Sequence, residues 1–142
     1  MYTKKLTLIF ESCIIIALTR IKGGIHSMVS KSFEITTLLH GLGVSSKLKG
    51  FSYLYDIIYD VISNEYNSFK MIELYRSLSQ KYESSCSNIT KCIRESIEKS
   101  WNNGSVDLIE KVFGYSIGYD NNFPSNSLYV NTVVDYLRAC SL

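Results

Sequence analysis

Apolar residues recur every three or four positions from residue 35 to the C-terminal end of the chain, which is the spacing of α-helices. The first set predicts a short helix that ends at Gly41 and Gly43, and it consists of Ile35, Leu38, Leu39 and Leu42. The second set starts after Gly50 and consists of Phe51, Leu54, Ile57, Ile58, Val61 and Ile62. The third set predicts one helix or two shorter ones, and it consists of Phe69, Ile72, Leu74, Tyr75, Leu78 and Tyr82.

The clearest helical pattern lies between residues 86 and 101. It follows the serines of residues 84–87, which are residues that cap helix starts by accepting a hydrogen bond from a free backbone N–H. One face is apolar or small and consists of Ile89, Cys92, Ile93, Ser96, Ile97, Ser100 and Trp101. The opposite face is polar and consists of Asn88, Lys91, Arg94, Glu95, Glu98 and Lys99. This pattern predicts an amphipathic helix that is buried along one side and ends at residues 102–104.

Two more helices complete the pattern. A short one is predicted from Val106 to Phe113, with Gly114 as its stop, followed by a loop or extended piece over residues 115–123. Pro124 and Ser125 then open a last helix, whose expected packing residues are Leu128, Val130, Val133, Val134 and Leu137. The sequence therefore predicts an all-α domain of about six helices over residues 35–142.

Residues 1–34 are expected to form an N-terminal extension and linker. Their apolar run, residues 6–18, is interrupted by Glu11, and Arg20 and Lys22 follow where a signal peptide would have small residues. The run is also shorter than the roughly 20 apolar residues that cross a bilayer. A buried or partner-binding segment is favoured over secretion or membrane insertion. Residues 23–33, which begin with two glycines, are interpreted as a linker.

Composition and charge exclude several kinds of function. The 142 residues suit one globular domain, and a net charge of +2 is too small to indicate nucleic-acid binding by itself. The four cysteines form no Cys-x-x-Cys pair and lie apart from both histidines, so we expect no metal site and free thiols in a reducing cytoplasm. No catalytic constellation or phosphate-binding loop stands out, so we expect no enzyme and no cofactor.

The region from Leu74 to Trp101 has the outline of a helix-turn-helix. In that motif the second helix enters the major groove of DNA and carries hydrogen-bonding side chains near its N-terminus. Residues of this kind are Ser87, Asn88, Thr90, Lys91 and Arg94. The same face can also be read as a solvated surface, because three pairs of opposite charge lie four residues apart and each would contribute about 0.2–0.5 kcal/mol. These pairs are Lys91 with Glu95, Arg94 with Glu98, and Glu95 with Lys99.

Several segments resemble the C-terminal effector domain of the stage-zero sporulation regulator A family. The similar segments are residues 35–44 (ITTLLHGLGV), 48–54 (LKGFSYL), 92–104 (CIRESIEKSWNNG), 113–115 (FGY) and 124–127 (PSNS). They occur in the family's order, with near-identical spacing, over about three quarters of the chain. The resemblance implies a six-helix DNA-binding domain that reads a short operator box in double-stranded DNA, often as tandem dimers.

The resemblance also implies which residues contact DNA. By position, these are Ser87, Asn88, Thr90, Lys91, Arg94 and Glu95. The family has arginine at the positions of Asn88 and Lys91, glutamate at the position of Thr90 and histidine at the position of Glu95. Arg94 keeps the family residue. The family also joins this domain to a receiver domain of roughly 120 residues, for which residues 1–34 are too short, so we expect no phosphorylation switch within the chain.

Three functional hypotheses follow. The first is a cytoplasmic, sequence-specific transcription regulator that reads an operator through the helix at about residues 86–101. The second is a protein–protein module that pairs with a full-length sporulation regulator, since the recognition face is substituted and residues 6–18 form an apolar segment. The third is a folded relative with little remaining activity.

Overall fold

The computed structural model describes residues 25–114 and 123–141, and within them it contains six helices and no strand. The helices are α2 (Ile25–Gly41), α3 (Lys49–Ser63), α4 (Met71–Tyr82), α5 (Cys86–Asn103), α6 (Val106–Phe113) and α7 (Asn126–Cys140). The prediction of an all-α fold of about six helices is confirmed. The expectations for residues 1–24 and for the loop at 115–122 lie outside the described residues.

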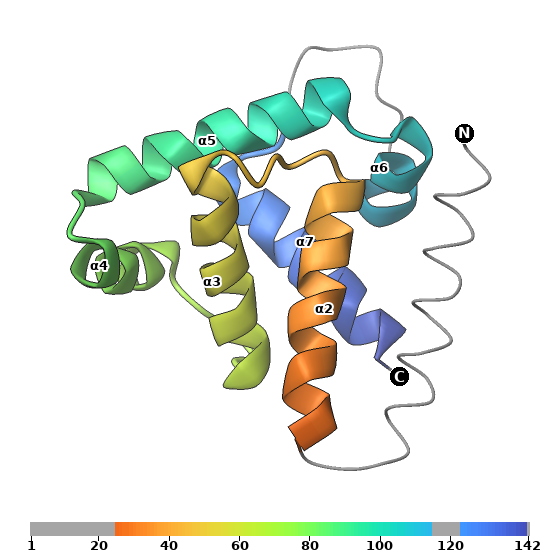
Figure 1. The fold of residues 1–142 in the computed structure, drawn as a ribbon, viewed down its shortest axis with the longest axis horizontal. Helices are drawn as coiled ribbons and strands as arrows, with labels where there is room; N and C mark the ends of the chain where they lie inside the picture. Colours follow the sequence, from red (N-terminus) through yellow and green to blue (C-terminus); the bar gives the residue numbers. More distant parts are fainter. Residues whose placement is uncertain (1–24, 115–122, 142) are drawn as a thin grey trace.

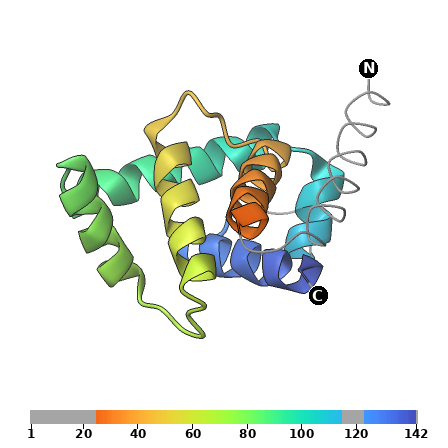
Figure 2. The same cartoon turned by 60° about the horizontal axis from the view of Figure 1, so that its bottom comes forward.

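Helix α5 is the long element against which the others are arranged (Figure 1). It runs across one side of the molecule, with α4 at its start and α6 at its end, while α3 packs closely against it. Helices α2 and α3 lie side by side, and α7 passes beneath both of them (Figure 2). The two helices of the predicted helix-turn-helix, α4 and α5, thus form one edge of the bundle.

The core lies where α3, α5 and α7 meet. Each of these helices contributes fully buried aliphatic side chains, which include Leu54, Ile57 and Ile58 from α3, Ile89, Ile93 and Ile97 from α5, and Val130, Val133 and Val134 from α7. Helix α2 covers this cluster with Leu38 and Leu39. The predicted apolar stripe of α5 is confirmed, because six of its seven members are buried and Cys92 is half-buried. Burial of this kind is the main favourable contribution to folding.

Serine hydroxyls cap the N-terminal ends of three helices, and the sequence predicted two of these helix starts. Ser85, Ser105 and Ser125 each accept a hydrogen bond from the backbone N–H three residues later. Such a bond satisfies one of the donors that a helix start leaves without an intrahelical partner. Gly114 ends α6 in the left-handed conformation, with φ at 69°, so the predicted bounds of this helix are confirmed.

The expected linker at residues 23–33 is wrong from Ile25 onward, because α2 begins there and runs through the expected domain boundary at 34/35. Two serines of this stretch form side-chain hydrogen bonds in the folded chain. The Ser30 hydroxyl donates to Glu34 at 3.2 Å, and the Ser32 hydroxyl lies 2.6 Å from the hydroxyl of Tyr55 on α3. The helical pattern was hidden because Met28, Val29 and Phe33 are exposed.

Of the two alternatives predicted for residues 69–82, the structure shows one helix, α4, which begins at Met71. One smaller prediction differs from the structure. In α7, Leu128 is 49% exposed and does not pack in the core, whereas Tyr129 beside it is fully buried. The Tyr129 hydroxyl lies 3.2 Å from the hydroxyl of Ser100, which in turn donates to the backbone carbonyl of Leu42 at 2.9 Å. Because Ser100 gives the Tyr129 hydroxyl a polar partner within the core, Tyr129 can be buried there in place of the neighbouring Leu128.

Within the two described stretches, no helix combines the length and apolar character that crossing a membrane requires.

Candidate nucleic-acid interface

A three-residue turn joins α4 to α5. Glu83 adopts the left-handed conformation, with φ at 50°, and the backbone N–H of Ser84 then donates to the carbonyl of Ser79. The Ser79 hydroxyl donates to the carbonyl of Ser84 at 2.6 Å, which closes the turn from the other side. Ser85 caps α5. The two hydrogen bonds between Ser79 and Ser84, together with the Ser85 cap, therefore fix the turn and the direction in which α5 starts.

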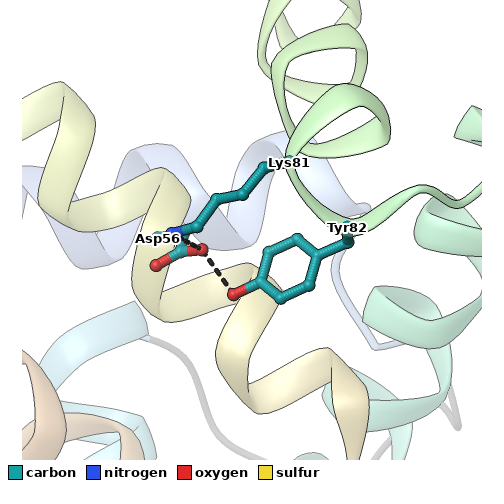
Figure 3. Close-up of polar contacts among 3 residues, drawn as sticks. All are labelled: Asp56, Lys81 and Tyr82. Atoms are coloured by element: carbon teal, nitrogen blue, oxygen red, sulfur yellow. Dashed lines mark hydrogen bonds and ion pairs between the residues drawn. The ribbon is translucent and has the colours of Figure 1, made fainter.

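The end of α4 is attached to α3 by one carboxylate (Figure 3). The hydroxyl of Tyr82 and the ammonium group of Lys81 both donate to Asp56, at 2.6 Å and 2.8 Å. Burial, and then the hydrogen bond to the nearby negative charge of Asp56, raise the pKa of Tyr82 to about 12. The tyrosine therefore remains a neutral hydrogen-bond donor at physiological pH.

The exposed side of α5 carries the six residues that the sequence singled out. Thr90 is half-buried, and the other five are exposed: Ser87, Asn88, Lys91, Arg94 and Glu95. Two of the six already form local hydrogen bonds. The Asn88 amide donates to the Ser84 hydroxyl at 2.8 Å, and the Thr90 hydroxyl donates to the carbonyl of Cys86 at 2.7 Å.

The charged residues of this face differ in how they are held. Lys91 and Glu95 lie 4.0 Å apart and are 74% and 55% exposed, so their attraction is weak and both can contact another molecule. Arg94, which the sequence pairs with Glu98, instead donates to the carbonyl of Pro124 at 2.7 Å. Its guanidinium carbon lies 4.0 Å from the centre of the Phe123 ring.

An open groove runs between this side of α5 and the start of α7. It gathers five of the six candidate residues, Ser87, Thr90, Lys91, Arg94 and Glu95. Asn88 does not line the groove. The opposite wall is formed by Ser125, Asn126 and Ser127, and Tyr75 of α4 also lines it. Its lining residues carry hydroxyl, amide and ammonium groups, which contact phosphates and base edges in protein–DNA complexes.

In residues 25–114 and 123–141, no group of three histidine, cysteine, aspartate or glutamate side chains is placed to hold a metal ion. Cys86, Cys92 and Cys140 are free thiols.

The family model for the C-terminal domain of the sporulation initiation factor Spo0A matches residues 35–137. The chain belongs to this family. The Spo0A C-terminal domain is a DNA-binding effector domain that regulates transcription in sporulation, so the resemblance seen in the sequence is confirmed. The match begins in the middle of α2, and the first ten residues of that helix, residues 25–34, precede the matched region.

Sequence reasoning missed one wall of the groove in this Spo0A-family domain. Ser125 was expected to start a helix, but nothing in the spacing showed that residues 125–127 would lie beside residues 87–95. The connection is made by Asn126, whose amide donates to the carbonyl of Thr90 at 3.1 Å and to the Tyr75 hydroxyl at 3.2 Å. A contact across 36 residues leaves no periodic signal in a single sequence.

Proposed function

We propose that this chain is a sequence-specific transcription regulator that places the N-terminal half of α5 in the major groove of double-stranded DNA. The observation that supports this most is the arrangement of α5 itself. One side of the helix is buried along its whole length, while the other side presents polar residues beside an open groove. A recognition helix needs both properties, because a rigid support must hold its reading side chains in place. A DNA-binding role would place the protein with the chromosome in the cytoplasm.

The proposed contact surface consists of Ser87, Asn88, Thr90, Lys91, Arg94 and Glu95. Lys91 is 74% exposed and can donate to a phosphate or to guanine. Asn88 can pair with adenine only if its amide leaves the Ser84 hydroxyl, which it now contacts at 2.8 Å. Glu95 can accept a hydrogen bond from the amino group of cytosine. Because four of these residues differ from the family pattern, we expect the preferred operator to differ from the family's.

The deciding experiment measures fluorescence anisotropy of labelled duplexes with the purified protein across a salt series. The duplexes carry the family's operator box, a scrambled version of it, and a pool of randomised sequences from which the tightest binders are selected. Binding to one sequence about a hundredfold more tightly than to the scrambled duplex supports the proposal. Equal, weak binding to all duplexes would leave only phosphate contacts, and absent binding at moderate salt would contradict the proposal.

Lys91→Ala tests the surface at one residue. If Lys91 contacts a phosphate, the variant binds more weakly and the slope of log affinity against log salt falls by about 0.9. Lys99→Ala is the matched control, since Lys99 is an exposed lysine on the same helix, two turns further from α4. An equal loss in both variants would show that the charge of the helix matters but the proposed surface does not.

A second candidate function is pairing with a full-length sporulation regulator or with another copy of the chain. It is favoured by the exposed apolar side chains of α2, since Met28, Val29 and Phe33 are 60%, 65% and 45% exposed. Apolar side chains that gather on a surface are typical of protein interfaces. Replacing these three residues by serine should abolish association in analytical ultracentrifugation if pairing is the function. Lys91→Ala should leave that association unchanged.

A further inference from the structure

Arg94 is attached to a part of the chain about 30 residues downstream. One of its terminal nitrogens donates to the carbonyl of Pro124 at 2.7 Å, and its guanidinium plane covers the ring of Phe123 at 4.0 Å. Pro124 is buried and Phe123 is half-buried. A guanidinium group can form both contacts at once because it is planar and carries five N–H donors in a rigid array.

The two residues that Arg94 holds lead directly into α7. Ser125 follows as the cap, and α7 starts at Asn126. Asn126 makes the return connection, because its amide donates to the carbonyl of Thr90 on α5 and to the hydroxyl of Tyr75 on α4. The start of α7 is therefore attached to α5 from both sides, by Arg94 and by Asn126. These contacts determine how far Ser125 and Ser127 lie from the exposed side of α5.

We propose that Arg94 is a positioning residue, which fixes the start of α7 beside the recognition helix and thereby sets the width of the groove between them. Arg94, itself a member of the proposed contact surface, then also supports the wall of the groove through Phe123 and Pro124. This inference rests on the proposed function for its consequence in DNA binding, but the attachment itself can be tested without DNA. The arginine retained from the family pattern thereby gains a second role, the support of the groove wall.

The test is a double-mutant cycle with Arg94→Ala, Phe123→Ala and the double variant. Unfolding in urea is followed by the fluorescence of Trp101, the chain's one tryptophan. If Arg94 and Phe123 act through each other, the double variant loses no more stability than the more damaging single one. The same non-additivity is expected in affinity for the selected duplex, with a loss of about threefold to tenfold in each variant. The salt slope should stay unchanged, because no phosphate contact is removed.

Two conservative variants separate positioning from charge. Arg94→Lys keeps the positive charge but lacks the planar group, so it should lose affinity as Arg94→Ala does. Phe123→Leu keeps an apolar side chain in place, so it should fold even if Phe123→Ala does not, yet it lacks the aromatic face. Its affinity should fall in parallel with that of Arg94→Lys.

Three outcomes would overturn the proposal. The first is a Phe123→Leu variant with full affinity beside an Arg94→Ala variant whose salt slope has fallen by about one, since that pattern means a direct phosphate contact. The second is full affinity in Arg94→Lys, which means that charge alone is needed. The third is an additive cycle in urea unfolding. If the unchanged protein binds no duplex, the proposed function fails, and the unfolding cycle alone then decides whether Arg94 holds Phe123.

Discussion

The attachment of α4 to α3 through Asp56 leads to a prediction about stability. Asp56→Ala removes the acceptor of two hydrogen bonds, from the Tyr82 hydroxyl and the Lys81 ammonium group (Figure 3). Both donors lie at the C-terminal end of α4, immediately before the turn that leads into α5. We expect the substitution to lower the free energy of unfolding and to loosen the position of that turn.

The size of the loss follows from the exposure of each partner. A hydrogen bond to a charged group contributes about 1.5–3 kcal/mol. Tyr82 is 37% exposed and regains water when its partner is lost, so the lower end, about 1.5 kcal/mol, applies to Tyr82→Phe. Lys81 is 61% exposed, and an ion pair of this kind contributes about 0.2–1 kcal/mol. Asp56→Ala should therefore cost about 2 kcal/mol, Tyr82→Phe nearly as much, and Lys81→Ala about 0.5 kcal/mol.

Urea unfolding measures these differences, with Trp101 as the reporter, because this side chain is 93% buried and should change fluorescence on unfolding. Asp56→Asn is the matched control, since an amide oxygen can still accept from Tyr82 but the charge is gone. We expect it to fall between the unchanged protein and Asp56→Ala. The reasoning is refuted if Lys81→Ala costs more than Tyr82→Phe, or if the losses in Asp56→Ala and Tyr82→Phe add fully in the double variant.

Two further predictions concern the core. Burial raises the pKa of Tyr129 to about 12, so the folded protein keeps the hydroxyl proton at a pH near 10, where the unfolded chain loses it. The contribution of this residue to the free energy of unfolding should therefore be complete below pH 10 and fall by on the order of 2–3 kcal/mol up to pH 12. A Tyr129→Phe variant should show a smaller alkaline loss of stability in unfolding titrations. Alanine normally stabilises a helix relative to glycine, but at Gly50 a Cβ atom would lie 2.4 Å from the carbonyl oxygen of Cys92 and 2.0 Å from the Ser96 hydroxyl. Gly50→Ala should therefore lower the thermal midpoint by about 2–4 °C for each kcal/mol lost, and a raised midpoint would contradict this packing.

Local patterns in the sequence were sufficient for much of the fold. The stripe of α5 was predicted residue by residue, because a helix buried along one side leaves a regular spacing of apolar residues. The bounds of α6 followed from Gly114, whose left-handed conformation few other residues adopt. The start of α2 could not be predicted in this way. Its first turns expose Met28 and Val29 and bury Ser30, which reverses the usual relation between polarity and burial.

The candidate site was predictable on one side only. The polar face of α5 follows from helical spacing, and five of the six candidate contact residues line one groove. The other wall depends on the path of α7, which is determined by packing of the whole core. For the same reason, spacing paired Arg94 with Glu98, whereas the folded chain brings the Pro124 carbonyl and the Phe123 ring within reach of Arg94.

The contacts that hold α5 in place do not involve the side chains that differ from the family pattern. Asn126 binds the backbone carbonyl of Thr90, which is present whatever side chain stands there. Ser100 donates to the carbonyl of Leu42 from the buried side of the helix. Asn88, Lys91 and Glu95, by contrast, are exposed and make contacts only within their own helix and its preceding turn. Under the proposed function, substitution at these positions would change which DNA sequence is read while the scaffold stays the same. Loss of the fold would instead require changes in the buried contacts, so we expect a different operator on an intact Spo0A-family fold.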